Sequence, residues 1–124
     1  MTARYFLCFI QILLFLFHRQ DFCGHLSEQI LGTVSFRKCF LGADGVDFDA
    51  DDIMATDIFT ARINEIVADR AANVCLLADS SKFTRRSFIR YADISQVNMV
   101  ITDRQLDQSL VEKLVARGCR IELV

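Results

Sequence analysis

Two short apolar stretches, KCFLGA at residues 38–43 and VCLLA at residues 74–78, decide the fold that the sequence predicts. Each is an almost unbroken apolar run of strand length, which is typical of a strand buried on both faces of a parallel sheet. Between them, Thr56 or Asp57 can cap the start of a helix that runs to Ala71. Its apolar residues recur at the spacing of one buried helix face: Phe59, Ile63, Ile66 and Val67. The order strand, helix, strand indicates a parallel pair with a crossover helix.

The alternation of strands and helices continues on both sides of this unit. The sequence predicts a short helix at 26–31, a short extended piece at 88–91, a third buried strand at 98–102, a helix at 106–117 and a closing strand at 119–124. Gly118 suits the position just after a helix, and an acidic loop is expected at 44–52. The predicted fold class is therefore α/β, with a partial parallel sheet and crossover helices.

Composition and charge narrow the class of protein. The chain has 124 residues, the length of one domain. Its content of 52% hydrophobic and 24% charged residues is typical of a folded protein rather than a disordered tail. The net charge is −2, whereas a nucleic-acid-binding domain usually gathers a basic excess on one face. The nearest basic group, Lys82, Arg85, Arg86 and Arg90, is typical of a solvated surface or a small-anion site. We therefore do not expect this chain to bind DNA by itself.

The cysteines and histidines do not predict a metal site. The five cysteines are odd in number and form no Cys-x-x-Cys pair, so neither a zinc site nor a disulfide framework is expected. His18 and His25 lie far along the chain from any set of ligands with metal spacing. The sequence also lacks a P-loop, a dinucleotide fingerprint and a nucleophile elbow. We expect no metal, no cofactor and no catalytic residue, and a reducing cytoplasm as the simplest location.

Residues 1–18 form an apolar leader that differs from the rest of the chain. From Tyr5 to Phe17 the sequence is apolar except for Gln11. Three interpretations are open: a foreign leader joined to a real domain by a misplaced start or a frameshift, a segment buried in the core, or a membrane or export signal. The run is shorter than the roughly 20 residues that span a bilayer, and no small-residue cleavage site follows it. These two features favour the first two interpretations.

Two loops leave the carboxyl ends of predicted strands, where open α/β sheets bind ligands. The first loop contains Gly42, Asp44 and Gly45. Its glycines allow the backbone to approach a ligand closely, and Asp44 is suited to accept hydrogen bonds from sugar hydroxyls or to act as a base. The same residues also fit a tight turn in which Asp44 only binds nearby backbone amides. Both interpretations stay open on this motif alone.

The second loop contains Asp79, Ser80, Ser81 and Lys82. A carboxylate, two hydroxyls and an ammonium group suit a polyol phosphate, because Lys82 supplies positive charge and the serines donate hydrogen bonds. The two arginines that follow would add bidentate phosphate contacts. The alternative is a turn that resembles a helix cap, with solvated basic residues beside it.

Taken together, these loops resemble the signature of one protein family. The stretches FLGADGVD at 40–47, LLADSSKF at 76–83 and VITD at 100–103 are similar, in order and in spacing, to successive motifs of the DeoR-family C-terminal sensor domain. The stretch GHLSE at 24–28 is similar to the helix start that precedes the first motif. The resemblance covers residues 19–124 and not the apolar leader.

The resemblance implies a fold and a function. The family's sensor is related to ribose-5-phosphate isomerase and glucosamine-6-phosphate deaminase (the NagB/RpiA/CoA transferase-like fold), and it senses a phosphorylated sugar without converting it. By resemblance, Asp44 with Gly42 and Gly45 holds the position of an aspartate that is functional in the isomerase relatives, and Lys82 falls in the family's Asp-Ser-Ser-Lys turn. Intact members bind operator DNA through an N-terminal winged helix-turn-helix, and the effector changes that binding. Many repress operons for carbohydrate catabolism.

The chain departs from the family pattern in two ways. By resemblance, we expect the helix-turn-helix and the first part of the sensor, with its phosphate-gripping loop, to be missing and residues 1–18 to stand in their place. The family's Gly-x-Thr-Thr segment corresponds to residues 53–57, where only Thr56 matches. We therefore expect residues 19–124 to be the C-terminal part of a truncated sensor, with weak or no ligand binding. We also expect a sheet edge without a partner strand, at which copies of the chain associate as a homo-oligomer.

Two functions from different classes follow from these observations. The first is the effector-sensing part of a DeoR-type bacterial regulator of carbohydrate metabolism, present as a truncated remnant that reaches operator DNA only through the missing helix-turn-helix. The alternative is a small sugar-phosphate isomerase-like enzyme, which the placement of Asp44 and Lys82 at strand ends suggests. A membrane-tethered interaction domain would rest on the apolar leader alone.

Overall fold

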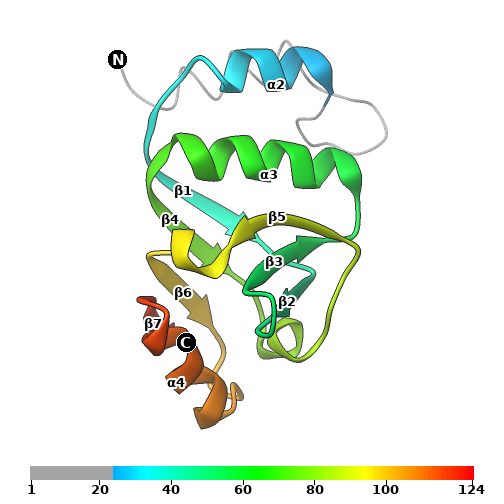
Figure 1. Ribbon diagram of the computed structural model, residues 1–124. Coiled ribbons are helices and arrows are strands. Elements are labelled where there is room, and N and C mark those ends of the chain that lie inside the picture. Colours follow the sequence, from blue (N-terminus) through cyan, green and yellow to red (C-terminus); the bar gives the residue numbers. More distant parts are fainter. Residues whose placement is uncertain (1–23) are drawn as a thin grey trace.

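A parallel sheet of four strands carries the two predicted loops in the structure, a computed structural model that describes residues 24–124 (Figure 1). The strands, in sheet order, are β1 (Phe36–Gly42), β4 (Ala71–Leu77), β6 (Met99–Thr102) and β7 (Arg120–Leu123). The register pairs Gly42 with Leu77, so β1 and β4 end at the same edge of the sheet. The predicted α/β class and the parallel pairing are confirmed.

The predicted helices between strands are present with shorter bounds. They are α3 (Ile58–Arg70) and α4 (Gln108–Ala116). The N-cap of α3 is Asp57 rather than Thr56, because the Asp57 carboxylate accepts hydrogen bonds from the backbone N–H and the hydroxyl of Thr60, each at 2.8 Å. Gly118 follows α4 with a φ of 90°, a conformation that favours glycine and ends the helix where the sequence predicted.

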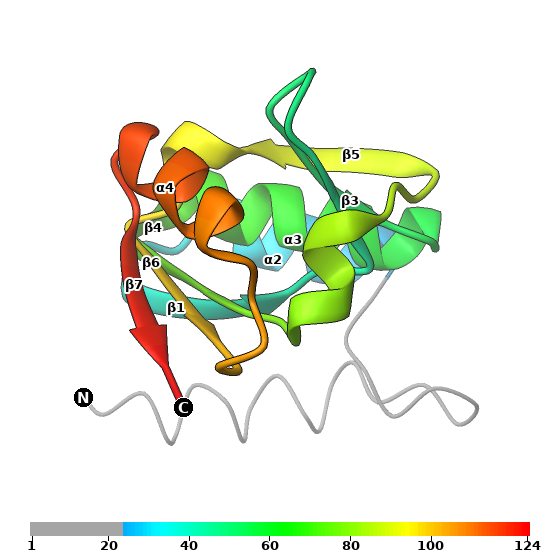
Figure 2. The same cartoon turned by 90° about the horizontal axis from the view of Figure 1, so that it is seen from below.

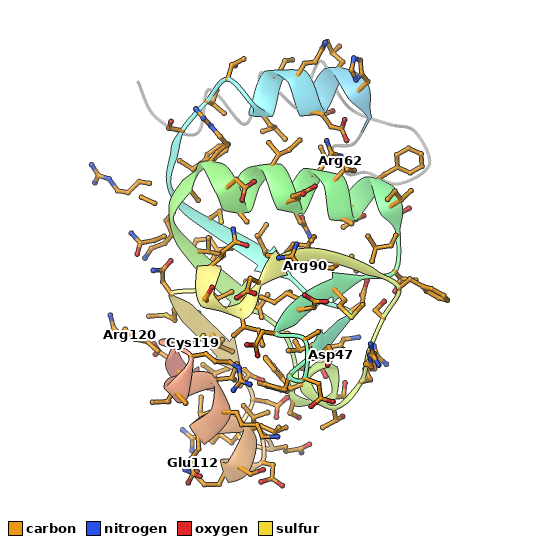
Figure 3. The ribbon with its side chains drawn as sticks, viewed as in Figure 1. Asp47, Arg62, Arg90, Glu112, Cys119 and Arg120 are labelled. Carbon is orange, nitrogen blue, oxygen red and sulfur yellow. The ribbon has the colours of Figure 1, made fainter. Side chains whose placement is uncertain are left out.

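A short helix, α2 (His25–Leu31), packs on α3. Leu31 is buried against Ile63 and Ile66 of α3. At the rim of this contact the Arg62 guanidinium lies between the two helices, and its Nε donates to Glu28 Oε1 at 3.2 Å (Figure 3). The apolar stripe of α3 is therefore shared between the parallel sheet and α2.

The helices lie on one face of the parallel sheet (Figure 2). Strands are added in one direction from β1 to β7, and right-handed crossovers between such strands fall on the same face. Val74, Leu76 and Val100 are buried beneath them, whereas Phe40 on the opposite face is 60% exposed. The prediction that these strands are buried on both faces is therefore wrong for residues 24–124, since no helix of this range covers the second face.

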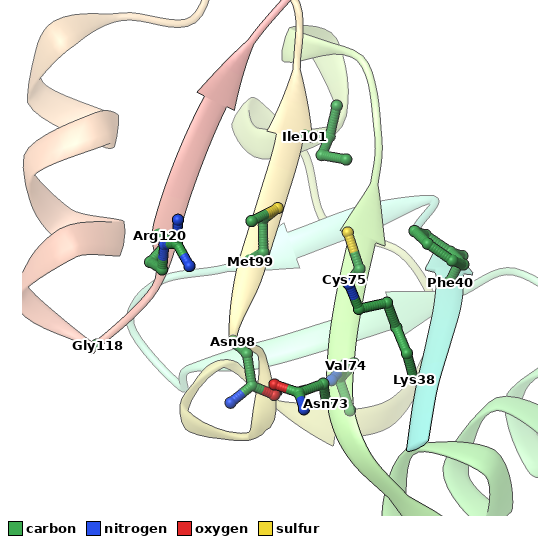
Figure 4. Close-up of a pocket in the computed structure, with 10 residues that line it drawn as sticks. All are labelled: Lys38, Phe40, Asn73, Val74, Cys75, Asn98, Met99, Ile101, Gly118 and Arg120. Atoms are coloured by element: carbon green, nitrogen blue, oxygen red, sulfur yellow. Dashed lines mark hydrogen bonds between the residues drawn. The ribbon is translucent and has the colours of Figure 1, made fainter. Parts of the chain in front are cut away.

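This second face holds a cavity of about 410 Å³ over the middle of the strands (Figure 4). Its lining mixes apolar and polar side chains, among them Lys38, Phe40, Cys75, Met99, Ile101 and Arg120. None of the residues that line it belongs to the two loops for which the sequence predicts a ligand, so the two sites are separate.

A second sheet contains the residues that were expected as an acidic loop, and its third strand overlaps the extended piece predicted at 88–91. Its strands are β2 (Gly45–Asp47), β3 (Asp52–Ala55) and β5 (Ile89–Asp93), all antiparallel, in the order β2-β3-β5. Asp47 is buried, and its Oδ1 accepts from the N–H groups of Asp49 and Ala50 at 2.9 and 3.3 Å. Asp51 has a φ of 59°, which completes the turn between β2 and β3. The aspartates therefore shape a hairpin rather than an open loop.

The two sheets are joined by a buried tyrosine. Tyr91 of β5 is 3% exposed and donates its hydroxyl to the carbonyl of Gly42 at 2.6 Å, where β1 ends. Burial raises the pKa of Tyr91 above its ordinary value, so the phenol stays neutral and remains a donor. This bond fixes the end of β1, and with it the start of the first predicted loop.

The β2–β3 turn also contacts α4. The Arg117 guanidinium, at the end of α4, donates to Asp51 Oδ1 and to the carbonyl of Phe48, the latter at 3.1 Å. It lies over the Phe48 ring at 5.4 Å from the centroid. A single side chain thus connects segments that are 66 positions apart.

Within residues 24–124 no helix is long and apolar enough to cross a membrane. The apolar leader at residues 1–18 lies outside the described residues, so its three interpretations remain predictions.

Candidate functional site

A cavity of about 390 Å³ lies at the carboxyl edge of the parallel sheet, where β1 and β4 end side by side. The first loop contributes Gly42, Ala43 and Asp44, and the second contributes Ala78, Asp79 and Lys82. The remaining wall comes from β3, β4 and α3: Ala55, Leu77, Thr60 and Asn64. The fold therefore brings together the two loops that the sequence singled out.

Asp44 is held in place by the backbone around it. Its Oδ2 accepts a hydrogen bond from the N–H of Thr56 at 2.8 Å, and its own N–H donates to the carbonyl of Met54 at 2.9 Å. The Nε of Arg85 donates to the Asp44 carbonyl at 3.0 Å. The interpretation of Asp44 as a turn former therefore has direct support, while Oδ1 makes no hydrogen bond with residues 24–124 and stays available to a ligand.

Asp79 caps a short 3-10 helix, η1 (Ser80–Thr84), that follows β4. Its Oδ1 accepts from the hydroxyl of Ser81, and from the Ser81 N–H at 3.0 Å. These hydrogen bonds, with the hydroxyl contact as the largest cause, lower the pKa of Asp79. The cavity therefore contains an ionised carboxylate at neutral pH.

Lys82 provides the positive charge of the cavity. Its N–H donates to the Asp79 carbonyl at 3.1 Å, and Phe83 beside it is 2% exposed and anchors η1 in the core. Within the described residues the Lys82 ammonium makes neither an ion pair nor a hydrogen bond. The anchored backbone of η1 therefore presents to the cavity a cation that has no partner among residues 24–124.

Three of the seven predicted ligand residues do not line the cavity: Gly45, Ser80 and Ser81. A Cβ at Gly45 would lie 2.7 Å from the carbonyl oxygen of Arg85, so this glycine permits close packing of two backbone segments. Ser80 donates its N–H to Asp103 Oδ2 at 2.8 Å. These residues hold the loops in position around the cavity.

The two arginines considered as phosphate ligands have structural partners. Arg86 Nη2 lies 2.9 Å from Oδ2 of the buried Asp47, and Arg85 binds the Asp44 carbonyl. Both contacts tie the segment before β5 to the β2–β3 hairpin. Neither arginine is among the residues that line the cavity.

Sequence reasoning missed the wall that α3 contributes. Thr60 and Asn64 are one helical turn apart and both line the cavity. The available signal was a pair of polar residues at i and i+4 beside the apolar stripe, with an asparagine in a helix interior, where it is unfavourable. Among residues 24–124 no cluster of three or more His, Cys, Asp or Glu side chains could hold a metal ion.

Comparison with known proteins gives one consistent result. The family model described as the DeoR C terminal sensor domain matches residues 15–104. Over 98 residues the chain is 31% identical to the HTH-type transcriptional regulator GlpR of Haloferax volcanii, covering 79% of this chain and 38% of that protein. It is 30% identical over 105 residues to a putative aga operon transcriptional repressor of Escherichia coli O157:H7, covering 85% of this chain and 39% of that protein.

The name of a third relative includes a small molecule, glycerol 3-phosphate. The glycerol-3-phosphate regulon repressor of Escherichia coli K12 is 30% identical over 103 residues, which cover 81% of this chain and 40% of that repressor. The matched part of this chain thus spans about two fifths of the length of each of these three relatives.

Proposed function

Because this chain belongs to the family of DeoR C-terminal sensor domains, we propose that it is the effector-sensing part of a regulator of carbohydrate metabolism and that its effector is a phosphorylated sugar. The observation that carries this proposal is the cavity at the sheet edge, which combines Asp44, Asp79 and Lys82. Carboxylates accept hydrogen bonds from sugar hydroxyls, and an ammonium group attracts a phosphate. The two loops thus provide carboxylates for the hydroxyl groups of a sugar phosphate and an ammonium group for its phosphate.

We propose sensing rather than catalysis at this site. The relatives are named as transcription regulators, which supports a non-enzymatic role. The geometry adds a chemical reason at Asp79, whose Oδ1 already accepts two hydrogen bonds from Ser81. The lowered pKa of Asp79 also makes it a poor proton donor at neutral pH.

The extent and fold of the sensor domain, and the location of DNA binding, are also part of what we propose. We infer that residues 19–124 are the C-terminal part of the sensor and that its fold is of the NagB/RpiA type, supported by a parallel sheet with a cavity at its carboxyl edge. Operator DNA is assigned to a helix-turn-helix in the intact regulator. The net charge of −2 supports the assignment of DNA binding to another part of the regulator, since a DNA-binding surface is basic.

The experiment is an NMR titration of the whole chain with glycerol 3-phosphate, ribose 5-phosphate and a hexose 6-phosphate, carried to concentrations at which weak binding is visible. We expect chemical-shift changes at Gly42–Asp44 and at Asp79–Lys82. Lys82→Ala should weaken binding by about tenfold, the effect of removing one charge-assisted hydrogen bond. Lys38→Ala is the matched control, because Lys38 lies on the other face of the sheet.

Two results would contradict this proposal. One is the absence of shift changes at both loops with every sugar phosphate, and the other is an equal loss of affinity in the Lys38 and Lys82 variants. The same spectra follow the ligand itself, so conversion of ribose 5-phosphate to its ketose would favour the isomerase-like alternative over sensing.

A further inference from the structure

Asn64 is the polar group of the cavity that the motifs do not explain. It lies in the interior of α3, one turn after Thr60, and lines the cavity together with residues of the two loops. Its side-chain amide makes no hydrogen bond with any residue between 24 and 124. The side chains of Asp44, Thr60 and Asp79 each make a hydrogen bond with a protein group. Asn64 shares the lack of such a bond with Lys82.

The position of Asn64 is unfavourable for the helix. Asparagine lowers helix stability in an interior position because its side chain competes for backbone hydrogen bonds. Asp57 already caps α3, so Asn64 is not required to start it. A residue that breaks a local rule without a structural compensation is expected at a functional site.

The chemistry of an amide fits a hydroxyl better than a phosphate. The amide carries both a donor and an acceptor, as a sugar hydroxyl does, whereas a phosphate dianion offers acceptors only. The charged side chains of the cavity are Asp44, Asp79 and Lys82, two negative and one positive. Lys82 is therefore the one positively charged group that lines the cavity, and the α3 side chains that line it are uncharged.

From these observations we infer that Asn64 determines specificity by binding a hydroxyl group of the sugar, while Lys82 binds the phosphate end. This inference rests on the proposed function and deepens it, because it divides the cavity into a hydroxyl-reading part and a phosphate-binding part. The site then distinguishes sugar phosphates by their hydroxyl pattern and not by the phosphate that they share.

The test compares Asn64→Ala and Lys82→Ala in the full chain, with ribose 5-phosphate and inorganic phosphate as separate ligands. Asn64→Ala should weaken binding of ribose 5-phosphate by about tenfold and leave the affinity for inorganic phosphate unchanged. Lys82→Ala should weaken both. Asn73→Ala is the matched control, since Asn73 lies in the cavity on the opposite face of the sheet and should change neither.

Two further measurements separate this role from a structural one. Asn64→Ala should raise the melting temperature, because alanine favours the helix, so stability and affinity move in opposite directions. In the wild-type spectrum the Asn64 side-chain amide signals should shift with ribose 5-phosphate and not with inorganic phosphate.

The outcomes distinguish the inference from its premise. If Asn64→Ala leaves sugar-phosphate binding unchanged while Lys82→Ala weakens it, the role of Asn64 is refuted and the proposed function stands. If Asn64→Ala weakens the binding of both ligands equally, the amide does not read hydroxyls. If neither ligand shifts either loop in the wild-type protein, the proposed function itself fails.

Discussion

Gly45 shows how closely the frame of the cavity is packed. A Cβ at this position would lie 2.7 to 2.9 Å from backbone atoms of Arg85, Arg86 and Ser87. None of these atoms belongs to a flexible side chain that could move aside. The first loop can therefore keep its path only if residue 45 has no side chain.

We expect Gly45→Ala to destabilise the protein by about 1–3 kcal/mol, because an added methyl group forces the backbone apart. Gly42→Ala is the control, since its Cβ would meet the carbonyl oxygen of Leu77 at an ordinary 3.8 Å. Urea unfolding monitored by circular dichroism measures both. Equal midpoints for the two variants would show that the contact at Gly45 relaxes without strain.

At the residue scale, the sequence indicated which two loops meet at the candidate site, but not which of their residues line the cavity. Asp44, Asp79 and Lys82 follow apolar strands, and polar groups at strand ends are a local pattern that can be read directly. Gly45 was expected to approach a ligand, but the backbone that approaches it belongs to the protein. Asn64 was missed because its neighbours in the cavity come from distant positions of the chain.

The α3 helix depends on its first residues for its position beside the cavity. Asp57 accepts two hydrogen bonds from Thr60, and Thr60 in turn lines the cavity. The same cap therefore stabilises the helix and orients one of its polar side chains.

Removing this cap in Asp57→Ala should lower the free energy of unfolding by about 1 kcal/mol, because the first turn loses the acceptor for its N–H. Asp57→Asn, which can still accept that bond, should retain most of the stability. Thermal unfolding of the three proteins provides the comparison. An alanine variant as stable as the wild type would mean that solvent replaces the cap without loss.

At the element scale, the helices and parallel strands could be predicted because their apolar patterns are regular and local. In the second sheet, β5 was predicted as an extended piece, but β2 and β3 were not predicted, because they are short and lie beside aspartates, which usually indicate a loop. Asp47 is the instructive case, since it is buried and binds two backbone N–H groups and Arg86. A polar residue that is buried with its partners leaves no hydrophobic signal in the sequence.

Across the whole molecule, acidic capping groups link stability to pH. Four aspartates accept hydrogen bonds at turns or helix starts, and their pKa values are lowered: Asp79, Asp93, Asp103 and Asp107. The largest cause is a serine hydroxyl for the first two and a serine backbone N–H for the last two. In each case the folded protein holds the ionised form more strongly than the unfolded chain does.

A lowered folded-state pKa contributes stability that is present at neutral pH and is lost as pH falls. We therefore expect the melting temperature to decrease progressively below about pH 5, as protons bind the unfolded chain first. Asp107→Asn should flatten part of this decrease because it removes one of the four titrating groups. A melting temperature that stays constant down to about pH 3 would contradict the role of these caps.

The contact of Arg117 with Asp51 and Phe48 has a consequence for the lifetime of the folded protein. It joins segments 66 positions apart, so it can form only after much of the chain has closed. We expect Arg117→Met to speed unfolding by about fivefold, the equivalent of about 1 kcal/mol, and to leave the folding rate unchanged. Stopped-flow kinetics would show this as a shift of the unfolding limb alone, and a slower folding limb would place the contact in the folding nucleus. The arginine at the end of α4 would then determine how long each molecule stays folded, and not how quickly it folds.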